Sequence, residues 1–326
     1  MTSAGVAHHT EPVRVSGNTR RSLRTLMVAV LAATATVWSA AATQPANATA
    51  PPIVKEPLNY VALGSSFAAG PLISPVVDAN CTRSGNNYPH LVAEQLGYRL
   101  TDRSCSGATT ASILHKPHQP NYGLGAPQPP QIEAVTANTD LVTVTIGGND
   151  VGHMSRLVAD SCATLFERAR GGSSSAVFDG LCSTVGTAPS TEPAPDAYAK
   201  VEAALEAIVA EVRSRSPEAK VVFVDYLRIV PQDGTVCDAV PLTPERAKKT
   251  VRIHDAVADA TARAAKDTGA QLVRASQLGV GHSACSDDPW LAGFEVVQPG
   301  SGGAIFYHPN AKGMAAVADQ IVKQIS

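Results

Sequence analysis

The sequence predicts an α/β protein, with a central parallel sheet of about five strands that helices cover on both faces. Segments with strand character alternate with segments of helical periodicity along the chain. The strand segments are continuous apolar runs, not the alternation of apolar and polar residues that a sheet with one wet face shows. Both observations are typical of a single domain built on a parallel sheet.

The predicted strands are short and apolar, and several end at a glycine. The clearest is Leu141–Ile146, which reads LVTVTI and is followed by Gly147-Gly148. The first, Leu58–Leu63, ends at Gly64, where the chain is expected to turn. The remaining strands are predicted over Tyr98–Asp102, Val221–Val224 and Gln271–Arg274.

Helices are predicted where apolar residues recur at helical spacing or where boundary residues stand. The longest cover Asp196–Ser214 and a segment from Pro244 to about Lys266, which Thr243 precedes as an N-cap. Further helices are predicted over Tyr88–Leu96 and Ala311–Ile325. Two stretches are predicted to be long loops, and loops of that length usually build a site: Lys116–Gln131 and Gly152–Pro195.

Residues 1–48 predict an export signal and not part of the fold. Three arginines between positions 20 and 24 precede an apolar run over residues 26–41, and Ala46-Asn47-Ala48 matches an A-x-A cleavage site. The run is short for a membrane span, which needs about 20 residues. Thr19–Arg24 resembles a twin-arginine signal with Leu23 in place of the usual Phe, so the Tat and Sec routes both stay open. We expect a secreted domain over residues 49–326, with no stable membrane span after cleavage.

Charge and cysteine content limit the function classes. With 26 basic and 28 acidic residues the net charge is −2, which argues against a nucleic-acid partner bound through a basic face. All six cysteines follow the predicted signal, and an even number in an exported chain predicts disulfides, with fifteen possible connectivities. We expect sequential pairing, because each bond then closes one local loop: Cys81–Cys105, Cys162–Cys182 and Cys237–Cys285.

Residues that could carry chemistry follow the predicted strands. Ser65 and Ser66 come after the first strand, Gly107 after the second and Asn149 after the third, while His308 precedes the last helix. Ligands of parallel sheets bind at the carboxyl ends of the strands, so these residues are expected to converge. A hydroxyl, an imidazole and fixed N–H donors are the groups that ester hydrolysis needs, without a metal or cofactor.

The four blocks resemble the SGNH (GDSL) hydrolase family, in particular its secreted actinobacterial lipases and esterases. The resemblance runs from about Tyr60 to Lys312. It implies a three-layer α/β/α sandwich of the flavodoxin-like type and, in the secreted members, three disulfides. It implies Ser66 as the nucleophile and His308 as the general base. The oxyanion hole would consist of the N–H groups of Ser66 and Gly107 and the side chain of Asn149.

The sequence departs from the family pattern at two positions. Ser65 stands where the family usually has Asp, which leaves Ser65 as an alternative nucleophile, although the spacing from Gly64 favours Ser66. Ile305 stands three residues before His308, where the family often has Asp. We expect a main-chain carbonyl, that of Ile305, to accept the hydrogen bond from Nδ1 of His308. The alternative partners are the carboxylates of Asp287, Asp288 and Glu295.

The leading prediction is a secreted, monomeric serine esterase or lipase that acts on a small-molecule ester or lipid. One alternative keeps the fold and changes the substrate, giving a carbohydrate deacetylase or a phospholipase. Another is an exported binding protein on a disabled hydrolase scaffold, which the two replaced Asp positions would favour. Asp150 is predicted to be an N-cap for the segment that follows it, with no part in the chemistry. Six other histidines are predicted to be structural or solvated: His90, His115, His118, His153, His254 and His282.

Overall fold

A computed structural model describes residues 56–120, 125–169, 182–183, 190–295 and 304–326. The predicted export signal lies outside the described residues, and so do parts of both predicted long loops. The described residues belong to one compact unit. Within these ranges, no helix has the combined length and apolar character of a membrane span.

Five parallel strands form the central sheet, and the predicted α/β fold class is confirmed. The strand order is β4-β1-β5-β6-β7. Each predicted strand is found within one residue of its expected ends. The strands are β1 (Asn59–Gly64), β4 (Arg99–Asp102), β5 (Leu141–Thr145), β6 (Lys220–Val224) and β7 (Gln271–Val273). All five residues of β5 are buried, which explains its uninterrupted apolar pattern.

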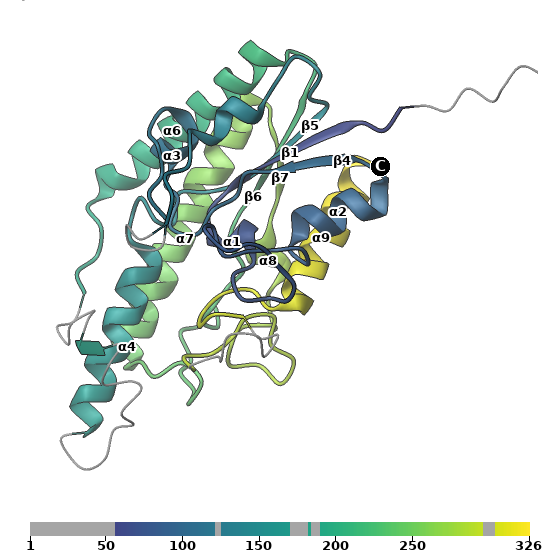
Figure 1. The fold of residues 1–326 in the computed structure, drawn as a ribbon. Helices are drawn as coiled ribbons and strands as arrows, with labels where there is room; N and C mark the ends of the chain where they lie inside the picture. Colours follow the sequence, from purple (N-terminus) through teal and green to yellow (C-terminus); the bar gives the residue numbers. More distant parts are fainter. Residues whose placement is uncertain (1–55, 121–124, 170–181, 184–189, 296–303) are drawn as a thin grey trace, which may run out of the picture. The chain divides into compact units, whose positions relative to one another are not determined.

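Helices cover both faces of this sheet and make three layers (Figure 1). On one side α6 packs against α7 and α3, and α4 packs against α7; on the other side α2 packs against α9. The helices are α2 (Tyr88–Leu96), α3 (Thr110–Leu114), α4 (His153–Ala169), α6 (Pro195–Arg215), α7 (Pro244–Thr268) and α9 (Ala311–Ile325). The four predicted helices are therefore found, with ends that differ by two residues at most.

Helix α4 corrects a prediction, because the sequence analysis assigned its residues to a long loop. Its inner face mixes apolar side chains with buried polar ones, so the apolar spacing typical of a helix is interrupted. Asp160 on that face is 1% exposed, and its carboxylate accepts hydrogen bonds from the backbone and hydroxyl of Ser190 and from Lys249. These partners are distant in sequence, so the local pattern could not report them.

Short elements stand near the carboxyl ends of the strands. Helix α1 (Ser66–Ala69) follows β1 at once, and α8 (Ala275–Leu278) follows β7. A hairpin of β2 (Val76–Asp78) and β3 (Arg83–Ser84) comes after α1. A 3-10 helix, Gln131–Ala134, precedes β5.

Three disulfides join the cysteines in the expected sequential order. They link Cys81 with Cys105, Cys162 with Cys182 and Cys237 with Cys285. The first connects the β2–β3 hairpin to the turn after β4, and so ties together two of the segments at the carboxyl edge of the sheet.

Candidate active site

Ser66 occupies the first position of α1, directly after β1. The turn requires Gly64, which has φ 156°, because a Cβ there would lie 2.8 Å from the carbonyl oxygen of Thr145. The first N–H groups of a helix have no partner within it, so the Ser66 N–H is available to a ligand. The Ser66 side chain is only 9% exposed and faces the loop that carries His308.

His308 lies within hydrogen-bond distance of Ser66, although 242 positions separate them. Its Nε2 is 2.8 Å from Ser66 Oγ, and its Nδ1 is 2.8 Å from the carbonyl oxygen of Phe306. A carbonyl oxygen can only accept, so Nδ1 carries the proton and Nε2 has a free lone pair. The Ser66 hydroxyl therefore donates to a nitrogen that can take its proton.

The Phe306 carbonyl replaces the expected partner, Ile305. The Ile305 carbonyl accepts instead from the backbone N–H of His308, at 3.1 Å. Tyr307, which stands between Phe306 and His308, has φ 61°. This left-handed conformation directs the Phe306 carbonyl to the imidazole ring. Among the described residues, no hydrogen bond or ion pair joins His308 to the three carboxylates that were alternatives, and one of them, Asp288, pairs with Lys312. The expectation of a main-chain acceptor agrees with the geometry, but the residue named for it was wrong.

Burial keeps the imidazole of His308 neutral. The side chain is 5% exposed, and burial lowers the pKa of His308 to about 4, although the bond to Phe306 partly opposes this shift. The ring also packs against that of Phe67, with 5.1 Å between centroids. At neutral pH the imidazole is thus an unprotonated base.

Gly107 follows β4 and Asn149 follows β5, the two strands that flank β1, so both residues stand at the same edge of the sheet as Ser66. The Cys105 N–H donates to the carbonyl of Gly64, and the Asn149 Nδ2 donates to the carbonyl of Ala108, at 3.0 and 2.9 Å. Asn149 and Ser66 line the same small cleft. The Asn149 amide has a second N–H, and the Gly107 N–H has no partner among the described residues. Both donors could therefore serve a ligand oxygen near Ser66.

Two glycines allow the Asn149 turn to approach its neighbours closely. A Cβ on Gly147 would lie 2.7 Å from Val201, and one on Gly148 would lie 2.9 Å from the ring of Tyr226. The Gly148 N–H donates to the Tyr226 hydroxyl at 2.9 Å. Close packing thus requires the two glycines of the GGN sequence, and the side-chain N–H donor requires its asparagine.

Ser65, the alternative nucleophile, has no hydrogen bond to the imidazole of His308 among the described residues. Its backbone N–H donates to the Thr145 carbonyl, and its side chain hydrogen-bonds Tyr226. Burial raises the pKa of Tyr226 to about 12. Ser65 is therefore part of the buried support of the site, and Ser66 is the serine that contacts His308.

The sequence analysis expected Asp150 to be an N-cap for the segment after it, but its carboxylate has other partners. Its carboxylate accepts from the backbone N–H and the hydroxyl of Thr110, the first residue of α3. It therefore joins the third block to the end of the second block.

The sequence analysis assigned no part in the site to three further residues: Phe306 and Tyr226 were not named, and His118 was predicted to be structural or solvated. Phe306 contributes only its carbonyl, Tyr226 supports the Gly148 turn, and the His118 ring is 2.8 Å from the Ser106 carbonyl. No residue type in the sequence signals a carbonyl acceptor. The only available sign for His118 was its place in a long Pro-rich loop.

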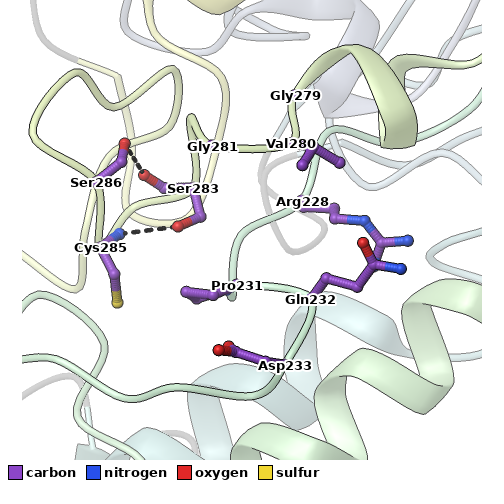
Figure 2. Close-up of a pocket in the computed structure, with 10 residues that line it drawn as sticks. All are labelled: Arg228, Pro231, Gln232, Asp233, Gly279, Val280, Gly281, Ser283, Cys285 and Ser286. Carbon is purple, nitrogen blue, oxygen red and sulfur yellow. Dashed lines mark hydrogen bonds between the residues drawn. The ribbon is translucent and has the colours of Figure 1, made fainter.

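Two possible ligand sites elsewhere contain none of Ser66, Gly107, Asn149 and His308. In the described part of the chain, one trio of acidic side chains is close enough to hold a metal ion, namely Glu202, Glu206 and Asp267 on α6 and α7. A cavity of about 420 Å³ lies between the segments 228–233 and 279–286 (Figure 2). The small cleft beside Ser66 is lined by Ser66 and Asn149, and His308 is hydrogen-bonded to Ser66.

Comparison with known proteins gives similarity over nearly the whole domain. The pattern of the GDSL-like Lipase/Acylhydrolase family matches residues 62–316, a range that includes all four blocks. Lipase 2 of Streptomyces coelicolor is 35% identical over 308 residues, which cover 91% of this chain and 96% of the relative.

Two solved structures are similar in fold. The extracellular lipase of Streptomyces rimosus has a TM-score of 0.59 and 26% identity, covering 82% of this chain and 100% of that one. Phospholipase A1 of Streptomyces albidoflavus has a TM-score of 0.62 and 23% identity, covering 83% and 100%. At that identity the second comparison supports the three-layer fold alone.

Proposed function

The chain belongs to the GDSL-like Lipase/Acylhydrolase family, and from that premise we propose that it cleaves esters through an acyl-enzyme on Ser66. Family membership and the lipase relatives make the chain a carboxylic ester hydrolase. The observation that carries the mechanism is the 2.8 Å contact between Ser66 Oγ and His308 Nε2. The site also argues against a disabled scaffold. The Phe306 carbonyl accepts the Nδ1 proton of His308 and so keeps the tautomer that the missing Asp would otherwise fix.

In the first half of the reaction, Ser66 Oγ attacks the carbonyl carbon of the ester while its proton moves to Nε2 of His308. The tetrahedral intermediate then collapses. The bond from carbon to the alcohol oxygen breaks, and His308 returns the proton to the departing alkoxide. The products are the free alcohol and an ester between the acyl group and Ser66.

In the second half, water replaces the alcohol. His308 takes a proton from the water molecule as its oxygen attacks the acyl carbon, and then protonates Ser66 Oγ as it leaves. The carboxylic acid departs and the enzyme is regenerated. Because Nδ1 stays bonded to Phe306, the same nitrogen, Nε2, handles the proton in both halves.

The negative oxygen of each intermediate would be held by three donors. These are the N–H groups of Ser66 and Gly107 and the free N–H of the Asn149 amide. Removal of one such donor typically lowers kcat by 10²–10³, or about 3 kcal/mol. Support comes from the shared cleft of Ser66 and Asn149 and from the unpartnered N–H of Gly107 among the described residues.

Covalent labelling with a fluorophosphonate tests the nucleophile. The wild type and Ser65→Ala should be labelled and should hydrolyse p-nitrophenyl acetate, while Ser66→Ala should do neither. Ser65→Ala is the matched control, because the two serines are adjacent and both buried. Hydrolysis by Ser66→Ala at the wild-type rate would refute the mechanism.

The ester class is the next question for the same site. A series of p-nitrophenyl esters from acetate to long acyl chains separates a lipase from an esterase, and acetylated xylan and phosphatidylcholine test the deacetylase and phospholipase alternatives. Activity on long chains is the expected result, given the lipases among the relatives.

We also infer export of residues 49–326. The support is the signal-like pattern of residues 1–48 and the extracellular lipase among the similar structures. Expression in an actinobacterial host should place the protein in the medium with its N-terminus at Thr49. Arg20→Lys combined with Arg21→Lys should abolish export by the Tat route and leave Sec export nearly unchanged.

A further inference from the structure

A histidine outside the catalytic pair contacts the peptide that carries one oxyanion donor. His118 lies between α3 and the 3-10 helix, and its Nε2 is 2.8 Å from the carbonyl oxygen of Ser106. Since that oxygen can only accept, Nε2 carries a proton and donates. The Ser106 carbonyl and the Gly107 N–H belong to one peptide unit.

A trans peptide is planar, and its C=O and N–H point in opposite directions. A hydrogen bond that fixes the direction of the Ser106 carbonyl therefore fixes the direction of the Gly107 N–H. It also polarises the peptide and makes that N–H a better donor. The geometry points to His118 as a positioning residue that aims the Gly107 N–H at the substrate oxygen, an assignment that rests on the proposed function.

The surroundings of Ser106 show why this restraint is needed. The Ser106 N–H donates to the Cys81 carbonyl at 3.2 Å, and its hydroxyl is 2.6 Å from that of Thr82. These bonds hold the chain before the peptide in question. After it comes Gly107, which has φ 84° and no side chain to limit its rotation. His118 is the side chain that holds the peptide between them.

His118 is itself held firmly. Its backbone N–H and carbonyl exchange two hydrogen bonds with Gln128, each 2.8 Å long. Its ring also lies against Gly107, because a Cβ on Gly107 would be 3.5 Å from Cε1 of His118. A half-buried ring on an anchored backbone can keep the carbonyl in one orientation between turnovers.

Loss of His118 should affect the transition state more than the bound ester. Donors contribute through their fixed orientation, and removal of a whole donor lowers kcat by 10²–10³. In His118→Ala the Gly107 N–H remains, but no side chain holds it in the direction of the substrate oxygen. We expect kcat to fall about tenfold, a part of the full donor effect, with KM changed less than about twofold.

The experiment compares His118→Ala, His118→Gln and the control His115→Ala in the full chain. His115 stands three residues earlier, with an exposed side chain. Steady-state rates on one p-nitrophenyl ester are divided by the concentration of sites titrated with a fluorophosphonate, so misfolded protein does not count. The Gln amide can donate to the Ser106 carbonyl and should restore most of kcat. Phenylboronic acid, which forms a tetrahedral adduct on serine, should bind His118→Ala about tenfold more weakly.

Other results would overturn the assignment. Unchanged kcat in His118→Ala would do so, and so would an equal loss in the Gln variant with normal boronic acid affinity, since that pattern indicates a purely structural role. Neither result contradicts the proposed function as long as hydrolysis by the wild type is lost in Ser66→Ala. Hydrolysis that persists in Ser66→Ala refutes the proposed function separately.

Discussion

The burial of His308 sets the pH range in which the catalytic pair can work. Its pKa of about 4 lies below the ordinary value of 6.5, because burial disfavours the charged ring. The base is active only when it is unprotonated. We expect kcat/KM to rise with pH, to be half-maximal near pH 4 and to be level above about pH 5. A pH profile on a substrate stable in acid measures this, and a half-maximum near 6.5 would contradict a buried imidazole.

His153 is a second buried imidazole, and it affects stability. Burial lowers the pKa of His153 to about 3, and neither ring nitrogen has a partner among the described residues. Below pH 6.5 the unfolded chain therefore binds a proton that the folded chain rejects, so the free energy of unfolding falls as the pH falls. Above that pH both states are neutral and the effect vanishes.

The variant His153→Leu removes this proton uptake. We expect it to be more stable than the wild type at pH 5 by about 2 kcal/mol beyond any difference at pH 7.5, from about 1.4 kcal/mol per pH unit. Urea unfolding at the two pH values measures the difference, and the value at pH 7.5 is the internal control. The same difference at both values would show that His153 does not titrate in this window.

At the scale of elements, the turn that carries His308 depends on α4. The Tyr307 hydroxyl is 2.6 Å from Ser161 Oγ, and Ser161 in turn donates to the Leu157 carbonyl within α4. The left-handed conformation of Tyr307 costs about 1–3 kcal/mol and persists only because its side chain is held. Tyr307 is fully buried and stacks on Phe294, with 5.3 Å between ring centroids.

The substitution Tyr307→Phe should therefore lower both stability and activity. We expect a loss of about 1 kcal/mol, and a double-mutant cycle with Ser161→Ala should show a coupling of similar size. Tyr60→Phe is the matched control, because it removes an equally buried hydroxyl bond, to Thr143 at 2.7 Å, away from the His308 turn. The control should lose stability and keep kcat. Equal kcat in both variants would mean that α4 does not position the turn.

At the scale of the whole molecule, the disulfides join segments that the sheet alone does not hold. Cys105 stands two residues before Gly107, and the carbonyl of its partner Cys81 accepts from Ser106. Replacing both cysteines with Ala should reduce the free energy of unfolding by about 3 kcal/mol. It should also lower kcat, since the peptide that carries the Gly107 donor loses one restraint.

The bond between Cys237 and Cys285 provides the comparison. It closes a longer loop, with a separation of 48 against 24, and its Cys285 lines the cavity of Figure 2, whose lining does not include Ser66. Its removal should cost a similar free energy but leave kcat per labelled site unchanged. Thermal unfolding and active-site titration of both double variants test this, and a matching kcat loss would indicate a general loosening of the fold.

The sequence alone determined the sheet and the four predicted helices, and its resemblance to a family pointed to the four residues of the candidate site. Apolar runs and helical spacing are local properties, so they report each element before it is packed. The positions of a serine, an amide and an imidazole after the strands and before the last helix suggested ester chemistry, and the family resemblance then named Ser66 and His308. Helix α4 escaped notice because its buried Asp160 is satisfied by Ser190 and Lys249, which are remote in sequence.

Only the tertiary structure decided which groups orient the site. The Phe306 carbonyl, and not that of Ile305, accepts the hydrogen bond from His308 because of one backbone angle at Tyr307. A tyrosine in the sequence does not predict a left-handed conformation. The contact of His118 with Ser106 depends in the same way on where a long loop folds back. Every residue has a main-chain carbonyl, so the sequence does not indicate which carbonyl will accept a given hydrogen bond. The direction of each carbonyl, and of the side chain that it binds, is set only when the chain packs.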